Sequence, residues 1–253
     1  MSDPVITVRG LSVRFGERFI LENLDLDVLR GEVLGVVGAS GTGKSVLLRA
    51  IIGLVPRTAG VVSVLGQELR PELGIVGDVE RRWGVLFQQG ALYSSLTVAQ
   101  NIQVPLREYL DLPERLLDEI AALKIALVGL AADAFGKYPS ELSGGMIKRA
   151  ALARSLALEP EILFLDEPTA GLDPISAGEF DALIRDLQQT LGLTVFMVTH
   201  DLDSLATICD RIAVVGDRKV LVAGDLDAML AFDHPWVRAY FRGPRSRGIR
   251  KAG

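Results

Sequence analysis

The sequence predicts an α/β protein built around a mainly parallel β-sheet, and three observations support this fold class. A glycine-rich loop at residues 38–43 separates an apolar run from a segment of helical pattern. Strand-like runs alternate with helical segments from residue 162 to residue 225, as in βαβ units. With 253 residues, 49% of them hydrophobic, the chain can bury a full core as one domain or as two closely joined lobes.

The first third of the chain is predicted to consist mostly of strands, because its apolar residues alternate or form short runs. The expected strands are residues 6–15, 19–28, 32–38, 61–69 and 81–88. The helix after the glycine-rich loop is predicted from residue 45 until Gly53 and Pro56 stop it.

A helical insert is predicted next, over residues 96–157. It is punctuated by Pro105, Pro113, Pro139 and Gly144–Gly145. The α/β pattern then resumes with a strand at 162–167, a helix near 176–190, a strand at 194–200, a short helix and the segment 211–225.

Bulk properties exclude several classes of protein. No stretch approaches the roughly 20 apolar residues of a membrane span, and Asp3 and Pro4 stand where a signal peptide needs a basic start and an apolar run. We therefore expect a soluble chain that stays in the cytoplasm. The single cysteine, Cys209, excludes an internal disulfide and a cysteine-cluster metal site. A net charge of -5 argues against nucleic acid as a partner.

The first chemical motif matches G-x-x-x-x-G-K-[ST] in the strand-to-helix setting of a phosphate-binding loop. Its residues are Gly38, Ala39, Ser40, Gly41, Thr42, Gly43, Lys44 and Ser45. The glycines let backbone N–H groups converge on phosphates, and the start of the helix adds positive potential. Lys44 would reach the terminal phosphates and Ser45 would ligate Mg²⁺. The loop predicts that the chain binds ATP with Mg²⁺.

The second motif is an apolar strand, 162–165, that ends in Asp166 and Glu167. A strand of this kind is buried on both faces. Beside the phosphate loop, Asp166 would hold Mg²⁺ through its water shell, and Glu167 would take a proton from the water that attacks the γ-phosphate. The structural alternative is an acidic turn that leads into Pro168.

Further motifs, which stand in one order with the phosphate loop and the two acids, resemble those of the ABC ATPase family. Leu142–Met146, with the sequence LSGGM, resembles the ABC signature. Gln88 follows an apolar strand, Ala170–Asp173 follows the two acids, and Val198–Asp201 closes the next strand. The resemblance covers nearly the whole chain. It implies a P-loop NTPase fold, the ABC nucleotide-binding domain, with an antiparallel β subdomain and a helical subdomain, and ATP hydrolysis coupled to transport.

The resemblance also implies roles for single residues. Phe15 would stack on adenine, although a phenylalanine beside strand residues is also consistent with ordinary core. Gln88 would ligate Mg²⁺ and report on a membrane partner, with Gln89 as a rival for the same position. His200 would bond the γ-phosphate and position the attacking water. The catalytic residues implied are therefore Lys44, Glu167 and His200.

A pair of chains follows from the same resemblance. Ser143 and Gly145 open a helix whose positive end would face a γ-phosphate, which in this family belongs to the ATP held by the opposite subunit. Because the chain has one phosphate loop and one signature, the simplest arrangement is a homodimer with two ATP molecules between its subunits. Asp173 would lie near its dyad.

Met146 stands where most of the superfamily has glutamine, and with the surrounding motifs it resembles the Mla/Mce ATPases. That subgroup implies movement of phospholipid or a related lipid between the inner membrane and the envelope. Its partners are a multi-span permease, an Mce-domain lipid-binding protein and often a small STAS-domain protein, with the ATPase held peripherally on the cytoplasmic face of the inner membrane.

Three alternatives remain at this point. One is an ABC importer ATPase for another solute, such as an amino acid or an ion. A second is an ABC ATPase acting on DNA or ribosomes, which usually has long coiled insertions or two motors in one chain and needs a basic face. The third is a regulatory protein without activity, which the complete set of catalytic residue types disfavours.

We predict a RecA-like core with the antiparallel β subdomain at 1–95 and 158–232, a helical subdomain with the signature at 96–157, and a C-terminal extension at 233–253. The helical subdomain should receive a coupling helix of the permease, unless it is a self-contained amphipathic subdomain.

The extension resembles one that reaches over the neighbouring subunit. Its anchors would be Trp236, Val237, Tyr240 and Phe241. Alternatively, it is a solvated end or a strip near anionic lipid, formed by Arg242, Arg245, Arg247, Arg250 and Lys251.

Overall fold

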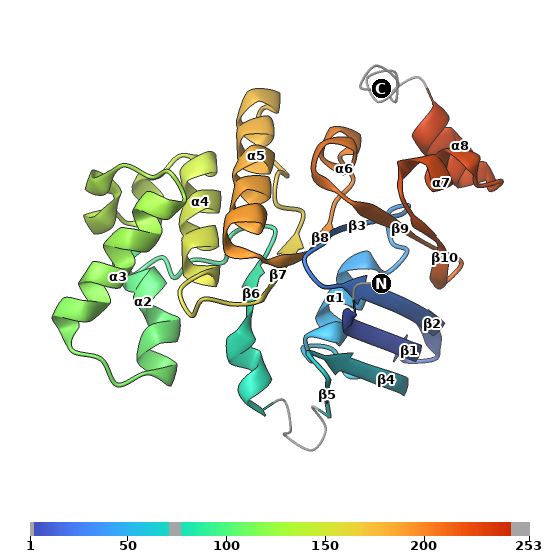
Figure 1. The fold of residues 1–253 in the computed structure, drawn as a ribbon, viewed down its shortest axis with the longest axis horizontal. Coiled ribbons are helices and arrows are strands. Elements are labelled where there is room, and N and C mark those ends of the chain that lie inside the picture. Colours follow the sequence, from blue (N-terminus) through green and yellow to red (C-terminus); the bar gives the residue numbers. More distant parts are fainter. Residues whose placement is uncertain (1–2, 71–76, 244–253) are drawn as a thin grey trace. The chain divides into compact units, whose positions relative to one another are not determined.

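The computed structural model describes residues 3–70 and 77–243 of the chain. The chain divides into two compact units, Met1–Val79 with Thr194–Gly253 and Glu80–Leu193. Both units combine strands with helices (Figure 1), so the predicted α/β class is confirmed. Within the two described ranges, no helix has the length and hydrophobicity needed to span a bilayer.

The first unit contains an antiparallel sheet in the order β2-β1-β4-β5. Its strands are Pro4–Phe15 (β1), Arg18–Leu29 (β2), Ala59–Val64 (β4) and Gln67–Glu68 (β5). The other strands of this unit follow the order β10-β9-β3-β8. They are Val33–Val37 (β3), Thr194–Val198 (β8), Arg211–Gly216 (β9) and Lys219–Gly224 (β10). Strand β3 runs parallel to both β8 and β9, and all of its residues are buried, which explains its apolar run without alternation.

Two strand predictions differ from the structure because of short turns. The segment 61–69 is interrupted at Leu65 and Gly66, whose φ angles of 52° and 80° end β4. The segment 211–225 forms the antiparallel hairpin β9–β10, with Asp217 and Arg218 at φ angles of 47° and 66°. Positive φ at two successive residues is the geometry of a tight hairpin turn.

Among its described residues, the first unit has one helix after the phosphate-binding loop and three in its C-terminal part. They are Lys44–Ile51 (α1), Leu202–Ile208 (α6), Leu226–Ala231 (α7) and Pro235–Arg242 (α8). In Figure 1, α7 and α8 lie side by side, and the two helices are in contact.

Helix α8 shows how the first part of the predicted C-terminal extension packs. Val237 and Phe241, two of the expected anchors, are 0% and 1% exposed in a cluster with Val37, Leu205 and Met229 of the same unit. The two residues are four positions apart and so lie on one face of the helix. This face of α8 therefore packs on its own chain, and the reach of the extension over a neighbouring subunit stays a prediction. The basic residues Arg245, Arg247, Arg250 and Lys251 lie outside the described residues.

The second unit contains the parallel strands Trp83–Leu86 (β6) and Ile162–Asp166 (β7). Its helices are Val98–Tyr109 (α2), Glu114–Leu127 (α3), Gly144–Ser155 (α4) and Pro174–Leu191 (α5), with 3₁₀ turns at Ala132–Gly136 (η3) and Pro139–Glu141 (η4). Strand β6 is shorter than predicted, because the 3₁₀ turn Gly77–Arg82 (η2) takes its first residues.

The helices predicted for residues 96–157 are present as α2, α3 and α4. Pro105 does not interrupt them, contrary to the prediction, because it lies inside α2. A proline within a helix removes one backbone donor and does not always end the helix. The second unit also includes β6, β7 and α5, so it is larger than the predicted helical subdomain. The subdomain boundaries stay a prediction.

Candidate functional site

The phosphate-binding loop connects β3 to α1 in the first unit. Gly41 and Gly43 have φ angles of 78° and 98°, a region that residues with a Cβ rarely adopt. A Cβ at Gly38 would lie 2.2 Å from the carbonyl oxygen of Val215, and one at Gly43 would lie 2.9 Å from the side chains of Ile20 and Leu21. These positions therefore need glycine, for the turn and for close packing.

The loop has the form of an anion cradle. No side chain caps α1 at Gly43. A Cβ at Gly41 would meet no atom within 4 Å, so the loop is open on that side. The ammonium group of Lys44 lies over the loop, where it donates to the carbonyl oxygens of Gly38 and Ala39 at 2.9 and 3.2 Å. Open backbone, the start of a helix and a lysine at one place suit nucleotide phosphates.

His200 follows β8, the strand beside β3. Val36 pairs with Val198 across these parallel strands, and the N–H of Thr199 donates to the carbonyl oxygen of Val36 at 3.2 Å. The phosphate loop and His200 therefore leave the sheet at the same edge. Parallel sheets bind ligands at the carboxyl ends of their strands.

Phe15 lies at the end of β1 and is 53% exposed, so it is not part of the core. This exposure excludes the ordinary core packing that the sequence left open. An exposed aromatic ring is available to stack on a flat base.

The two acidic residues lie at the end of β7, in the second unit. Asp166 is 2% exposed, whereas Glu167 is partly exposed and has a φ angle of 51°. A glutamate in the left-handed region is strained, and such strain is typical of functional positions. Both carboxylates follow a fully buried strand, as predicted.

Lys148 of α4 brings Glu167 and Gln88 together. Its ammonium donates to the backbone carbonyl oxygen of Glu167 at 3.1 Å and to that of Gln88 in a short hydrogen bond. Burial lowers the pKa of this lysine, while the nearby carboxylates of Glu167 and Asp166 act to raise it. The backbone of Glu167, just after β7, and that of Gln88, just after β6, are thus joined through one buried cation.

The signature motif forms the start of α4. The hydroxyl of Ser143 accepts from the N–H of Met146 at 3.3 Å, and Ser143 is exposed. A Cβ at Gly145 would meet nothing within 4 Å among the described residues, so packing within this chain does not require glycine there. An open helix start of this kind suits a phosphate approaching from outside.

Asp173 caps the next helix, α5. Its carboxylate accepts from the N–H groups of Ile175 and Ser176 at 3.1 and 3.0 Å. The Ser176 hydroxyl also donates to it and lowers the pKa of the carboxyl.

The donor set for Mg²⁺ fits the ion by chemistry. The described residues contain no group of three or more histidine, cysteine, aspartate or glutamate side chains that would hold a metal. Mg²⁺ is usually held by one or two carboxylates together with substrate phosphates and water. The oxygen atoms of Ser45, Gln88 and Asp166 suit that arrangement.

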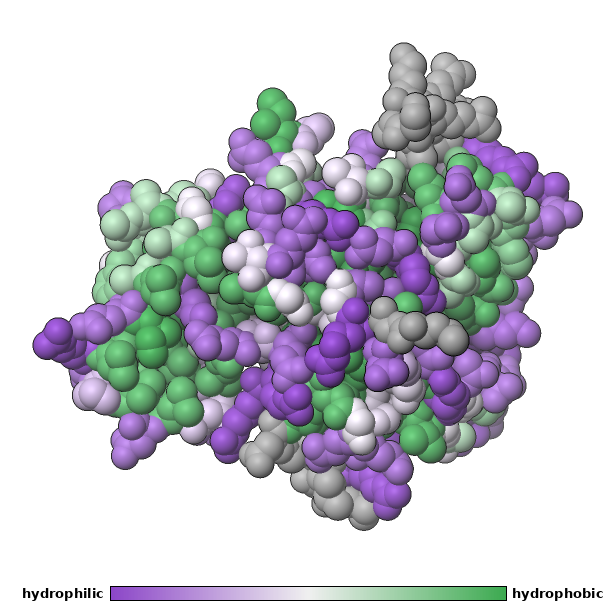
Figure 2. Space-filling model, in the orientation of Figure 1, coloured by the Kyte–Doolittle hydropathy of each residue, from purple (hydrophilic) through white to green (hydrophobic). Residues whose placement is uncertain are grey.

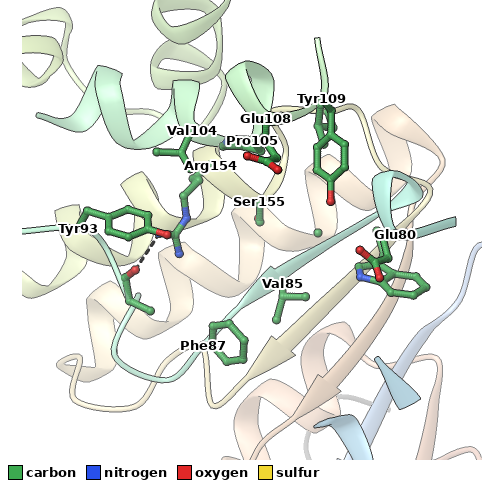
Figure 3. A pocket seen from close by; sticks show the side chains of 14 residues that line it. Glu80, Val85, Phe87, Tyr93, Val104, Pro105, Glu108, Tyr109, Arg154 and Ser155 are labelled. Carbon is green, nitrogen blue, oxygen red and sulfur yellow. Dashed lines mark hydrogen bonds between the residues drawn. The ribbon is translucent and has the colours of Figure 1, made fainter. Parts of the chain in front are cut away.

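A groove of about 560 Å³ opens in the second unit. Figure 3 shows Val104, Pro105 and Tyr109 of α2 around it, with Val85 and Phe87 from β6 and the residue after it. Its charged side chains are Glu80, Glu108 and Arg154. A dashed line in Figure 3 marks the bond from Arg154 to the carbonyl oxygen of Ala91, at 2.7 Å.

The surface of the same unit is apolar in places. Figure 2 shows hydrophobic residues gathered over α2 and α3. Leu110, Leu116 and Leu123 are among the exposed large hydrophobic residues of this region.

Three residues of the site were missed by sequence reasoning. They are Lys148, Arg154 and Tyr240, which all bond backbone carbonyl oxygens. The sequence offered one signal for Lys148 and Arg154: both are basic residues on a helix that is rich in small apolar residues.

The ABC transporter family model matches residues 21–170. The intermembrane phospholipid transport system ATP-binding protein MlaF of Haemophilus influenzae is 37% identical over 251 residues, which is 99% of this chain and 95% of that protein. MlaF of Escherichia coli K12 is 38% identical over 241 residues, covering 94% and 89% of the two chains. The probable ribonucleotide transport ATP-binding protein mkl of Mycobacterium leprae is 37% identical over 241 residues, covering 95% and 69%.

Solved structures are similar over most of the chain. cbiO1 from Clostridium perfringens, part of the ABC transporter complex cbiONQ, has a TM-score of 0.81 at 28% identity and covers 96% of this chain and 97% of its own. A dimeric bacterial ABC transporter cassette has a TM-score of 0.78 at 29% identity, covering 87% and 98%. The similarity therefore extends well beyond the phosphate loop.

Proposed function

Because this chain belongs to the ABC transporter family of ATP-binding proteins, we propose that it drives the movement of phospholipid or a related lipid between the inner membrane and the cell envelope. The fold that the resemblance implied is confirmed, and the chain is an ABC-type ATPase that binds ATP. The observation that carries the lipid cargo is the similarity to MlaF of Haemophilus influenzae over 99% of this chain and 95% of that protein.

A second cargo class has one observation in its favour. The Mycobacterium leprae relative, named for ribonucleotide transport, is as identical to this chain as MlaF is, at 37%. The chain covers only 69% of that protein, against 95% of MlaF. The match over whole length favours the lipid cargo over a non-lipid solute, including the amino acid or ion importer considered from the sequence.

In the proposed mechanism, residues of the first unit bind the nucleotide. The loop 38–45 holds the phosphates through its backbone N–H groups and Lys44, and Phe15 stacks on the adenine. His200 donates to the terminal phosphate and holds the attacking water in place.

Residues of the second unit supply the base. Glu167 accepts a proton from the attacking water. Ser45, Gln88 and Asp166 would hold Mg²⁺, which neutralises charge on the phosphates when it is bound.

The active assembly that we propose is a homodimer. The solved cassettes that this chain resembles include a dimer, and a post-hydrolysis dimer with ADP and phosphate. In this arrangement Ser143 and Gly145 of one subunit face the phosphates held by the other, and Asp173 lies near the dyad. The open start of α4 supports this assignment.

The permease is proposed to dock in the groove beside α2. An apolar helix of the permease would lie in the groove, with Glu80 and Glu108 on one side of it and Arg154 on the other. The apolar lining and the separated charges of the groove support this site. An Mce-domain protein and a small STAS-domain protein are proposed as further subunits. The ATPase would then lie peripherally on the cytoplasmic face of the inner membrane.

Purification from membranes tests the cargo. We expect a multi-span permease and an Mce-domain protein to copurify with this chain, with phospholipid bound to them in mass spectrometry. Recovery of a periplasmic solute-binding protein in place of the Mce-domain protein would contradict the lipid cargo.

Substitution of Lys44 tests the ATPase. Lys44→Ala is expected to lower Mg²⁺-dependent phosphate release by about a hundredfold, the effect of losing one preorganised donor to a phosphate. Lys219→Ala, which removes an exposed lysine of the same unit, is the matched control. Equal activity of the two variants would argue against the assigned phosphate site.

A further inference from the structure

Lys148 is a buried lysine with its ammonium between two backbone segments. The residue is 5% exposed and lies on the buried face of α4. The ammonium bonds the carbonyl oxygens of Gln88 and Glu167, which come from the ends of two different strands. A buried cation is costly unless it is well bonded, so these two contacts hold both segments against α4.

The contact with Glu167 bears on the position of its carboxylate. Glu167 has a φ angle of 51°, a conformation that persists only when surrounding structure holds it. Lys148 bonds the carbonyl oxygen of this residue and thereby restrains its backbone. A shift of about 1 Å in a catalytic group is enough to reduce a rate strongly.

The contact with Gln88 belongs to a second set of bonds from the same helix. Arg154 donates to the carbonyl oxygens of Gly90 and Ala91 at 2.9 and 2.7 Å. Ala91 has a φ angle of 50°, which a residue with a Cβ rarely adopts, so the loop 88–91 is strained at this residue. Helix α4 therefore holds this loop by two cations, one near each end.

The loop also borders the groove. Phe87, Ala91 and Arg154 line it, so a helix seated there would touch the residues on both sides of Gln88. The carbonyl oxygen of Gln88 is joined to that of Glu167 by one ammonium group. This chain of contacts is short, and all of it lies within the second unit.

We propose that Lys148 is a positioning residue that transmits the state of the 88–91 loop, and so of the docking groove, to the Glu167 carboxylate. The inference rests on the proposed function for the roles of the groove and of Glu167. It adds the physical connection between them.

The test compares Lys148→Met with Lys124→Met in the full chain. Methionine keeps the length of the side chain and removes the donor. Lys124 is the matched control, because it is 6% exposed and lies in the same unit. Its ammonium group forms an ion pair with the exposed carboxylate of Glu159 at 3.5 Å. We expect Lys148→Met to lower the kcat of ATP hydrolysis about tenfold or more with the affinity for ATP changed less than about twofold, the pattern of a lost transition-state contribution.

Two further variants distinguish a loss of positioning from a loss of folding. Lys148→Arg and Lys148→Gln keep a donor, and we expect them to recover part of the lost kcat. The thermal midpoint of Lys148→Met is expected to fall no further than that of Lys124→Met. If Lys148→Met does not fold, Lys148→Gln is compared with the wild type instead: its shorter side chain keeps a donor, so its kcat should lie below that of the wild type while its affinity for ATP is retained.

The complex with the permease supplies the readout of coupling. In the copurified complex, ATP hydrolysis by the wild type and by Lys124→Met is expected to exceed that of the isolated chain. Lys148→Met should lose this stimulation.

Three results would overturn the inference: an unchanged kcat in Lys148→Met, equal losses in the two methionine variants, or a loss of ATP affinity that matches the loss of kcat. Absence of stimulation in the wild-type complex would instead contradict groove docking, while the kcat comparison in the isolated chain still tests Lys148.

Discussion

At the scale of single residues, Tyr240 links α8 to the loop that carries His200 in the first unit. Its hydroxyl donates to the carbonyl oxygen of His200 at 2.7 Å. The ring is held by Trp236, which stacks on it with centroids 4.7 Å apart, and by the edge of Phe241. A stacked ring whose hydroxyl bonds the backbone of His200 is suited to holding the loop that carries this residue.

Removing this hydroxyl should slow hydrolysis without loosening the fold. Tyr240→Phe keeps the stacked ring and removes a hydrogen bond of about 1 kcal/mol, so kcat is expected to fall about three- to tenfold. KM for ATP should stay the same. Steady-state kinetics check this, with Tyr138→Phe, an exposed tyrosine of the other unit, as the control. Unchanged kcat would mean that His200 is held by other contacts.

At the scale of residues, sequence predicted the secondary-structure setting of the motifs, while the chemical roles of their residues stay predictions. The loop 38–45 and the acids after β7 have the local setting that their motifs require. Lys148 and Tyr240 were out of reach for a physical reason. Their partners are backbone carbonyl oxygens 60 and 40 positions away in the chain, and a carbonyl oxygen carries no sequence signal.

At the scale of elements, the periodicity of apolar residues predicted whether a segment is a helix or a strand better than it predicted where the segment begins and ends. The buried strands β3 and β7 were found as runs of apolar residues, and α5 by its helical pattern. Errors arose where a short turn ends a strand, as at Leu65 and Gly66, and where a helix continues through a proline, as α2 does at Pro105. The packing of α8 against its own unit was not predicted. An amphipathic face predicts burial but does not say whether its partner is this chain or another.

The packing of α8 gives a prediction about stability. Phe241→Ala should lower the free energy of unfolding by about 3–5 kcal/mol, because it empties a site that is 1% exposed. Chemical denaturation of the monomer checks this. Equal stability of Phe241→Ala and wild type would show that α8 does not pack on its own chain.

At the scale of the whole molecule, a single chain leaves the starts of α4 and α5 exposed. The start of α4 has unfilled space at Gly145, and the start of α5 exposes Ile175 to 77%. Large apolar side chains at such exposure often mark an interface. The proposed homodimer would cover both. Because each site is then completed by the other subunit, we expect only slow hydrolysis in an isolated chain, although it has a full set of catalytic residue types.

Trapping the dimer tests this assembly. Glu167→Gln removes the proposed base and keeps the binding residues, so ATP should accumulate and hold two chains together. Sedimentation of this variant with ATP and Mg²⁺ is expected to show a dimer, and without nucleotide a monomer. Adding Ile175→Glu should abolish the dimer, because it places a charge in the interface. Leu191→Glu, at the other end of α5 and 47% exposed, should leave the dimer intact. A Glu167→Gln variant that stays monomeric with ATP would contradict the composite site, since Ser143 and Gly145 would then have no phosphate to face.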